Sequence, residues 1–418
     1  MELHQSLCLD AIFHNYCANT THREVYTTLS EDMNVLFVFH GKGYAGGSSI
    51  SNRDLVIELK QRGVNVIACI PYTHNNELYK DLCAAGVKCI QSYIPLQVWA
   101  RQNVVGVKRL KRLVKIVLSV LMYFPVEAEL AYLLKKHKIA LLHIGGAVVC
   151  AGALAAKVQR IPVVWHLREF VEEDHDMRWI CRKYAFYLFS TAKALLAVSD
   201  AVAEAYRSKT KKNLQLHTIY NGVYSISNQP LGHSILQSEE VHVMFAGGLV
   251  ETKGVFILIE AFSRVSQSTQ QKIVLDIYGR STTSELQRYC DLVDKLDMKE
   301  KVAYHGYCSD LTKAWDVADV VVVCSVSEAF GRVTAEAMVH GCLVVGTASG
   351  GTVEIIQDSL GVLVDNWDAQ SIALALDDII QNKEKYSQFA QNGRLSALER
   401  FSIERMTDQV CAVYGSLH

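Results

Sequence analysis

Residues 320–338, with the sequence VVVVCSVSEAFGRVTAEAM, begin as an uninterrupted apolar run and end as a helix-forming segment. A short run of valines is typical of a strand that is buried on both faces of a parallel sheet. The loop that follows, Ser325–Gly331, then lies at the carboxyl end of a strand, where open α/β sheets bind their ligands. This stretch therefore predicts a strand–loop–helix unit with a ligand site in its loop.

The same alternation of apolar runs and helix-forming segments extends from Asn34 almost to the end of the chain. The runs expected as strands are Val35–Phe39, Val64–Ile70, Val87–Ile90, Ala140–Ile144, Val163–His166, Ala194–Val198, Val241–Ala246, Lys272–Tyr278, Val302–Tyr304, Val320–Cys324, Leu343–Gly346 and Val362–Val364. Helices are expected between them, for example over 147–159 and 176–190. Repeated alternation of this kind is typical of a parallel sheet covered by helices on both faces. The predicted fold class is α/β, with two doubly wound domains.

The alternation is interrupted between the two halves of the chain. Residues 223–240 are rich in Ser, Asn, Gln, Pro and Gly, which favours a linker. We therefore expect an N-terminal extension over 1–32, a first domain over 33–222, the linker, and a second domain over 241–400. A final amphipathic helix is expected within 401–418.

The composition is that of a globular protein without strong charge. Of the 418 residues 50% are hydrophobic, and 42 Lys and Arg nearly balance 43 Asp and Glu to give a net charge of -1. This balance argues against a general nucleic-acid binder, so no nucleic-acid partner is expected. The 12 cysteines are scattered and form no Cys-x-x-Cys pair. Reduced thiols in a cytoplasmic protein are the simplest interpretation.

No stretch of the sequence is expected to cross a membrane. The first thirty residues contain acids and histidines without a long apolar segment, unlike a signal peptide. The run 116–124 is too short for a bilayer. The run 139–156 is divided by His143 and the pair Gly145-Gly146 into a strand and a helix. The protein is therefore expected to be cytoplasmic, or at most to rest on a membrane.

Two features of the first half fall at the ends of expected strands. Gly41, Gly43, Gly46 and Gly47 follow the first strand and precede a helix, where backbone amides favour an anion. The second strand does not end in the acid that a dinucleotide site requires, so a tight turn explains this loop equally well. His166 ends another strand, although a lone histidine there is more often structural. Its neighbours Arg168 and Glu169 are, taken alone, expected to form a local ion pair.

The second half carries a more specific pattern. The segment 246–254, AGGLVETKG, places Lys253 beside a helix start, which suits a diphosphate. Glu328 and Glu336 lie in the loop and the helix of the segment quoted first. Carboxylates accept hydrogen bonds from sugar and ribose hydroxyls, and free helix amides face phosphate. Each residue alone is more often a surface residue, but together they indicate a sugar-nucleotide site.

At these residues the chain resembles a known enzyme family. The spacing Glu-seven residues-Glu, together with Gly-x-Leu-x-x-x-Lys-Gly from Gly247 to Gly254, resembles the retaining GT-B glycosyltransferases of family four. That family includes glycogen synthases, sucrose synthases and bacterial mannosyltransferases. The resemblance covers the chain from about Asn34 onward. It implies two Rossmann-like domains facing a cleft, with a C-terminal helix that can cross back to the N-terminal domain.

The resemblance also implies roles for individual residues. Glu328 would bind the transferred hexose, Glu336 the ribose and Lys253 the diphosphate, while His166 would lie near the reacting sugar. The remaining donor-binding positions implied are Gly46, Gly47, Gly247, Arg280, Ala329, Phe330, Gly331 and Arg332. In one departure, Gly248 stands where the family usually has an arginine. Arg280 or Arg332 could supply the missing charge.

The reaction implied is hexosyl transfer with retention, without a metal or a cofactor beyond the nucleotide-diphosphate sugar as co-substrate. The one Asp-x-Asp, Asp174-His175-Asp176, is interpreted as a helix start rather than a metal site. Two alternatives stay open. Because of Gly248, the chain could be a catalytically inactive glycan- or partner-binding subunit. A sugar-nucleotide epimerase shares the architecture, although the paired glutamates speak against it.

The segment 82–126 contains no Asp or Glu but seven cations. Between Val107 and Phe124 the residues Leu110, Val114, Val117 and Leu121 recur at helical spacing. This predicts either a basic amphipathic helix on an anionic membrane or an ordinary surface helix packed on the sheet. With the resemblance, it favours a polyprenyl-diphosphate-linked acceptor, while a protein or a soluble glycan acceptor stays open. A peripheral contact through 101–124, at the inner face of the plasma membrane, is expected.

Overall fold

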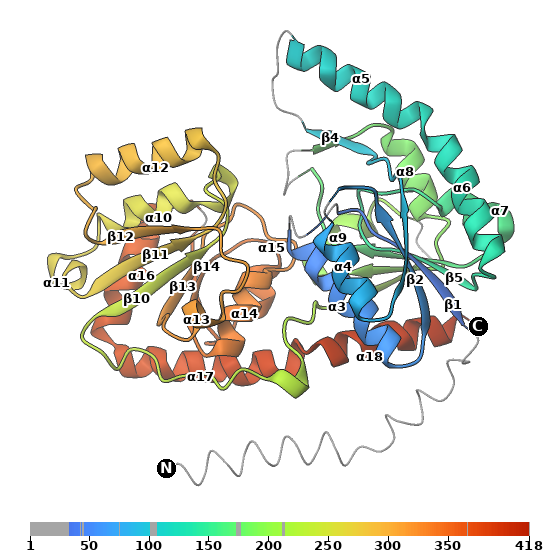
Figure 1. Ribbon diagram of the computed structural model, residues 1–418. Helices are drawn as coiled ribbons and strands as arrows, with labels where there is room; N and C mark the ends of the chain where they lie inside the picture. The colour runs from blue at the N-terminus through green and yellow to red at the C-terminus, as the bar shows by residue number, and fades with distance from the viewer. Residues whose placement is uncertain are drawn as a thin grey trace, which may run out of the picture.

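The computed structural model of the protein describes residues 33–417 except 42, 44–45, 75, 101–106, 173–176, 211–213 and 366. The predicted extension over 1–32, the start of the predicted membrane contact and the Asp174–Asp176 segment lie outside the described residues. Two α/β domains lie side by side, the N-terminal one on the right of Figure 1 and the C-terminal one on the left. The predicted fold class, two doubly wound parallel-sheet domains, is confirmed.

The N-terminal domain is built on a seven-stranded sheet in the order β3-β2-β1-β5-β6-β8-β9, in which every described pairing is parallel. The strands are β1 Asn34–Val38, β2 Asn65–Pro71, β3 Lys88–Ser92, β5 Leu141–Ile144, β6 Val163–Leu167, β8 Ala194–Ala197 and β9 Gln215–Thr218. The helices are α3 Gly47–Gln61, α4 Glu77–Ala84, α5 Val107–Leu121, α6 Tyr123–Lys136, α7 Ala153–Gln159, α8 Arg182–Phe189 and α9 Asp200–Arg207. The order of the strands reverses between β1 and β5, which places a crevice at their carboxyl ends.

The C-terminal domain repeats this plan with a six-stranded sheet in the order β12-β11-β10-β13-β14-β15. The strands are β10 Val241–Ala246, β11 Ile273–Tyr278, β12 Val302–Gly306, β13 Val320–Val323, β14 Leu343–Thr347 and β15 Val362–Val364. The helices are α10 Val255–Phe262, α11 Gln267–Gln270, α12 Thr283–Lys295, α13 Thr312–Trp315, α14 Arg332–His340, α15 Gly350–Ile356, α16 Ala369–Gln381 and α17 Lys383–Arg400. Here the order reverses between β10 and β13. The loops after these two strands are therefore the expected ligand-binding positions.

The chain crosses between the domains twice, and the two crossings are bonded to each other. The amide of Val223 donates to Phe401 O (2.8 Å), and the amide of Ile403 donates to Tyr224 O (2.8 Å). The second crossing continues into α18, Ile403–Ser416, which lies under the N-terminal domain in Figure 1. Its buried Tyr414 belongs to the core that contains β1 and α3. The C-terminal helix thus crosses back to the N-terminal domain, as the resemblance implies.

Two helices expected from the sequence are shorter than predicted. The first, over 147–159, begins only at Ala153, because Val149 forms a bridge with Leu96 and Gly152 has a left-handed backbone (φ 88°). The second, over 176–190, splits into β7 Met177–Trp179 and α8. Strand β7 pairs in antiparallel fashion with β4, Val98–Ala100, and this long-range pairing overrides the local helical pattern.

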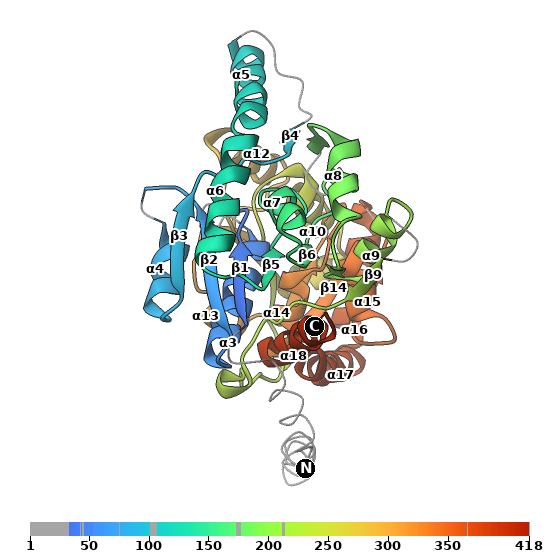
Figure 2. The same cartoon turned by 90° about the vertical axis from the view of Figure 1, so that its right-hand side faces the viewer.

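Helix α5 extends away from the body of the N-terminal domain and is joined end to end with α6 (Figures 1 and 2). Within the described residues, the segment Arg109–Lys136, which contains most of α5 and all of α6, is the one that is long and apolar enough to cross a membrane by length and composition. The same test is also met by core helices of soluble proteins. The α6 part of the segment buries Val126, Leu130 and Leu134 in the core of the N-terminal domain.

Candidate functional site

Two charged residues meet at the carboxyl ends of β10 and β13, on either side of the reversal of strand order. Lys253 ends the short 3-10 helix η2, Glu251–Lys253, and Glu328 lies in the loop after β13. Lys253 Nζ donates to Glu328 Oε1 over 2.5 Å, and Ser325 Oγ donates to the same oxygen over 2.7 Å. The fold therefore brings the predicted lysine and the first predicted glutamate into direct contact.

Glycines allow the loop that carries Glu328 to pack tightly against its neighbours. A Cβ on Gly254 would lie 2.1 Å from Cys324 O, and a Cβ on Gly350 would lie 2.1 Å from Glu328 O. The amide of Gly351 donates to Glu328 O (2.8 Å). Any side chain at Gly254 or Gly350 would displace the loop backbone. Gly254, Gly350 and Gly351 thus hold the loop in place.

The second predicted glutamate, Glu336, is held by an arginine at the start of α14. Arg332 Nε donates to Glu336 Oε1 over 2.6 Å. Burial raises the pKa of Glu336, and the adjacent Arg332 guanidinium opposes that shift. Helix α14 is preceded by Gly331 in a left-handed conformation (φ 95°). The first amide groups of α14, which have no acceptor within the helix, therefore lie directly after the loop that contains Glu328.

Arg332 also connects the two domains. Its Nη1 donates to Ser51 Oγ (2.9 Å) and to Gly222 O (3.2 Å), and its Nη2 lies 3.6 Å from Asp54 Oδ2. A Cβ on Gly47 would lie 3.2 Å from Arg332 Cδ. The start of α3, where the predicted phosphate loop ends, thus adjoins the start of α14. Gly46 precedes α3 and has open space where a Cβ would lie.

His166, predicted as the histidine near the reacting sugar, is fully buried. Its Nδ1 lies 3.2 Å from Nη2 of Arg168, whose other arm, Nη1, donates to Asn221. A guanidinium can only donate, so Nδ1 of His166 is the acceptor and the proton of the neutral ring sits on Nε2. Burial lowers the pKa of His166 well below its usual value, which keeps the ring neutral. Nε2 is itself buried and has no hydrogen-bond partner among the described residues.

Glu169 has a different environment from the local ion pair expected from the sequence. Its Oε2 accepts from the amide of Ala147 (3.0 Å), and its Oε1 lies 3.5 Å from Nε2 of His40. Asn52 on α3 donates to Gly145 O (2.6 Å). Sequence reasoning did not select His40, Asn52 or Glu169 as site residues. The available signal was that His40 and Glu169 directly follow strands.

The remaining predicted donor-binding residues are distributed around this centre. Arg280 lies with its guanidinium carbon 3.9 Å from the ring centroid of Tyr307, after β12. The amide of Gly247 donates to Tyr278 O (2.8 Å). Ala329 O accepts from Ser199 Oγ (2.5 Å), a contact between the domains. The ring of Phe330 packs against Phe401, with centroids 5.5 Å apart, so only its backbone can face a ligand.

Comparison with known proteins assigns both halves of the chain. Residues 45–224 match the family model described as Glycosyltransferase Family 4, and residues 233–396 match the model described as Glycosyl transferases group 1. The chain belongs to the family-four GT-B glycosyltransferases. This assignment agrees with the two parallel-sheet domains and with the paired Lys253 and Glu328.

Several known proteins are similar to this glycosyltransferase. The N-acetyl-alpha-D-glucosaminyl L-malate synthase of Bacillus anthracis is 23% identical over 316 residues, 71% of this chain and 81% of the synthase. An uncharacterized glycosyltransferase of Methanocaldococcus jannaschii is 30% identical over 183 residues, and the match spans 43% of this chain and 46% of the relative. Among solved structures, Anabaena HepE in complex with UDP superposes with a TM-score of 0.74 at 21% identity, covering 92% of this chain and 100% of HepE.

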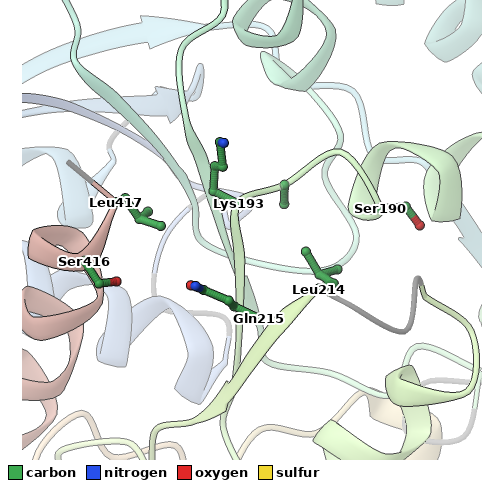
Figure 3. Close-up of a pocket in the computed structure, with 7 residues that line it drawn as sticks. Ser190, Lys193, Leu214, Gln215, Ser416 and Leu417 are labelled. Atoms are coloured by element: carbon green, nitrogen blue, oxygen red, sulfur yellow. The ribbon is translucent and has the colours of Figure 1, made fainter.

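A surface pocket of this glycosyltransferase lies away from the residues described above (Figure 3). It is lined by Ser190, Ala192, Lys193, Leu214, Gln215, Ser416 and Leu417. These residues adjoin the starts of β8 and β9 and the end of α18. Because ligands of open parallel sheets bind at the opposite, carboxyl ends of the strands, this pocket is not part of the candidate site.

Proposed function

We propose that the protein transfers a hexose from a nucleotide-diphosphate sugar to an acceptor hydroxyl with retention of configuration at the anomeric carbon. The observation that carries the proposal is the contact between Lys253 and Glu328 at the strand ends that flank the reversal of the C-terminal sheet. A cation beside a carboxylate suits a donor that joins a diphosphate to a sugar, because the cation binds phosphate and the carboxylate accepts from sugar hydroxyls.

In this proposal, donor binding replaces contacts within the protein by contacts with the ligand. Lys253 binds the diphosphate, and Glu328 accepts from hydroxyls of the hexose. The first amides of α14 add dipoles directed at phosphate. Glu336 accepts from the ribose. Anabaena HepE was crystallised with UDP and with UDP-glucose, which supports a uridine nucleotide as the first donor to test.

The transfer step breaks the bond between the anomeric carbon and the diphosphate oxygen and forms a bond from that carbon to the acceptor oxygen. The acceptor hydroxyl attacks from the face that the diphosphate leaves, and its proton passes to a phosphate oxygen. Lys253 and backbone amides stabilise the charge on the leaving diphosphate, as preorganised electrostatics do in many enzymes. We propose that these protein groups act without a metal ion.

His166 positions the sugar in this proposal. Its ring is neutral and its Nε2 proton has no partner among the described residues, so Nε2 can donate to a sugar hydroxyl. Arg168 fixes the tautomer that makes this possible. Such a histidine orients the substrate and is not a nucleophile.

The proposed acceptor is a glycan carried on a lipid, such as a polyprenyl diphosphate, in the synthesis of a cell-surface polysaccharide or glycoconjugate. The basic and apolar α5, which extends from the N-terminal domain, supports this choice because it gives that domain a surface suited to lipid. The corresponding location is the cytoplasm, at the inner face of the plasma membrane.

Variants of the central pair test the proposal. Lys253→Ala and Glu328→Ala should each reduce donor hydrolysis or transfer by at least about a hundredfold, the scale on which a lost transition-state contact acts. The control is Lys295→Ala, which changes an exposed lysine at the end of α12. Full activity in both site variants would contradict the proposal.

A thermal-shift screen with UDP-, GDP-, dTDP- and ADP-sugars separates an enzyme from an inactive subunit. A bound donor at a hundred times its Kd should stabilise the protein by about 2.7 kcal/mol. If none of the sugars raises the melting temperature, the alternative of a non-catalytic subunit is favoured, for which Gly248 is the specific support.

A further inference from the structure

The apolar side of α5 faces away from the protein. Its exposed apolar residues are Leu110, Leu113, Val114, Val117, Leu118, Val120 and Leu121, each with 47–63% of its surface accessible. An amphipathic helix of a globular protein normally turns this side toward the core. Figure 2 shows α5 extending beyond the sheet, joined at its end to α6. The interpretation as an ordinary surface helix packed through its apolar residues is therefore wrong for this chain.

The polar side of α5 is the one that faces the protein. Ser119 is buried, and the guanidinium of Arg112 lies 5.3 Å from the ring centroid of Trp99 on β4. At about 100° per residue, Arg112 and Ser119 occupy one side of the helix and Val117 and Leu121 the opposite side. The orientation of α5 is thus set by contacts with the N-terminal domain, and the apolar side is left without a described partner.

The charge on α5 is entirely positive. The sequence of the helix contains five cations, namely Lys108, Arg109, Lys111, Arg112 and Lys115, and no acidic residue occurs between Leu82 and Val126. By their helical positions, Arg109 and Lys111 flank the apolar side, and both are exposed. The acids that follow on α6 are engaged elsewhere, since Glu127 accepts from the amide of Gly152 and Glu129 accepts from Ser92 Oγ.

We propose that α5 lies in the interface of an anionic lipid bilayer, with its apolar side among the acyl chains and its flanking cations at the lipid phosphates. Because the apolar side of α5 faces outward, it can be buried among the acyl chains. The cations attract the helix to anionic headgroups. The proposal does not require the transferase activity proposed above, because it concerns binding alone.

A transmembrane arrangement fits the structure less well. Helix α5 has 15 residues and is therefore about 22 Å long, whereas a bilayer core is about 30 Å thick. Helix α6, which would have to complete a span, is packed into the domain core through Leu130 and Leu134. A second copy of the chain is also a poor occupant, because joining two α5 helices would bring their cations together without an acid to offset them.

Sedimentation of the full chain with vesicles tests the proposal. The protein should bind vesicles of phosphatidylcholine mixed with phosphatidylglycerol and should bind phosphatidylcholine alone much less. Leu113→Glu with Val117→Glu should abolish the binding, because both changes place a charge in the immersed side. Each substitution of Arg109, Lys111 or Lys115 by Ala should weaken the partition coefficient about fivefold. No donor is present, so the result is independent of transfer activity.

The matched control is Leu374→Glu, which changes an equally exposed leucine on α16 in the other domain. It should bind vesicles as the unmodified chain does, and the melting temperatures of all variants should agree because the changed residues are exposed. Binding that ignores the α5 substitutions would overturn the proposal. Self-association through α5 without vesicle binding would overturn it in favour of a second copy. Resistance to alkaline carbonate extraction would overturn it in favour of a transmembrane span.

Discussion

At the scale of single residues, the hydrogen bonds of one side chain fix the protonation of its neighbour. Arg168 can only donate hydrogen bonds, so its contact with His166 Nδ1 places the His166 proton on Nε2. His143, on the neighbouring strand, is also buried and lies 2.6 Å from Tyr414 Oη through its Nδ1. The contact between Tyr414 and His143 thus connects the C-terminal helix to β5, the strand that pairs with the one carrying His166.

The two buried histidines predict a loss of stability in acid. Burial lowers the pKa of both His143 and His166 well below the usual value. Below about pH 6.5 the unfolded chain binds protons that the folded chain does not. The free energy of unfolding should therefore fall as pH drops from 7 to 5, by up to about 1.4 kcal/mol per pH unit for each histidine.

Denaturant unfolding at pH 5, 6, 7 and 8 checks this prediction. The raised pKa values of the buried Glu127 and the half-buried Glu336 act with the opposite sign, so the unmodified chain alone is not decisive. The comparison is with His143→Gln, which keeps a polar group beside Tyr414 but has no titrating ring. Its unfolding free energy should depend less on pH; an identical slope in both proteins would contradict the prediction.

Gly248 stands where the resemblance leads us to expect an arginine, and the local geometry admits a side chain there. Its backbone is not left-handed, and a Cβ would lie 3.5 Å from Arg280 O, an ordinary contact. Gly248→Arg should therefore fold normally and lower the KM for the donor at least about fivefold, because a second cation would contact the diphosphate. Donor kinetics measure this effect.

The control for that experiment is Gly248→Gln, which adds a side chain without charge. If both variants change the KM to the same extent, the missing charge is not what limits donor binding. If Gly248→Arg unfolds, as judged by its melting temperature, the geometric part of the prediction is contradicted.

At the scale of elements, local pattern predicted most helices and strands but not those decided by distant partners. The valines of β13 and the loop after it were expected where the structure has them. In contrast, Met177–Trp179 was expected as helix and is a strand, because β4 supplies its hydrogen bonds from about eighty residues away. The periodicity of α5 was also visible, but not the direction of its apolar side.

The loops that carry Lys253 and Glu328 pack closely against their neighbours at glycines from three separate segments. Gly254 and Gly350 each lie where a Cβ would meet a loop carbonyl at 2.1 Å. Gly279 is closer still, since its Cβ would lie 1.7 Å from Gly247 O. The motif containing Gly254 was identified by resemblance. The physical role of these glycines, close approach of one loop to another, is visible only in the fold.

At the scale of the whole molecule, the two domains are joined by polar contacts on both sides of their junction. Arg332 reaches Ser51 from the C-terminal domain. On the other side Glu354, on α15, accepts from the amides of Asp200 (2.8 Å) and Ala201 (2.7 Å), so it caps helix α9 of the N-terminal domain. These contacts hold the candidate donor residues opposite the strand ends of the first domain.

Removing the Glu354 cap should loosen this arrangement. Glu354→Ala leaves two helix amides without their acceptor and should cost about 1–2 kcal/mol of stability. It should also increase the radius of gyration measured by small-angle X-ray scattering, because the domains separate. Glu354→Gln retains an acceptor, so its stability and its radius of gyration should lie between those of Glu354→Ala and those of the unmodified chain.

Glu300→Ala, at an exposed acid before β12, is the matched control for that experiment and should leave both measurements unchanged. An unchanged radius of gyration in Glu354→Ala, together with an unchanged melting temperature, would show that this cap does not hold the domains together.

The sequence by itself determined the fold class, the positions of the main strands and the family, because apolar periodicity and short motifs are local properties. The predicted domain boundaries and the roles of the site residues stay predictions. Only the tertiary structure decided that Arg332 links Glu336 to Asp54, that the ring proton of His166 sits on Nε2 and that the apolar side of α5 points outward. The physical reason is that a pattern along the chain shows only that a side chain or a helix face needs a partner. The order of strands in the sheets decides which distant residue, or which external surface, becomes that partner.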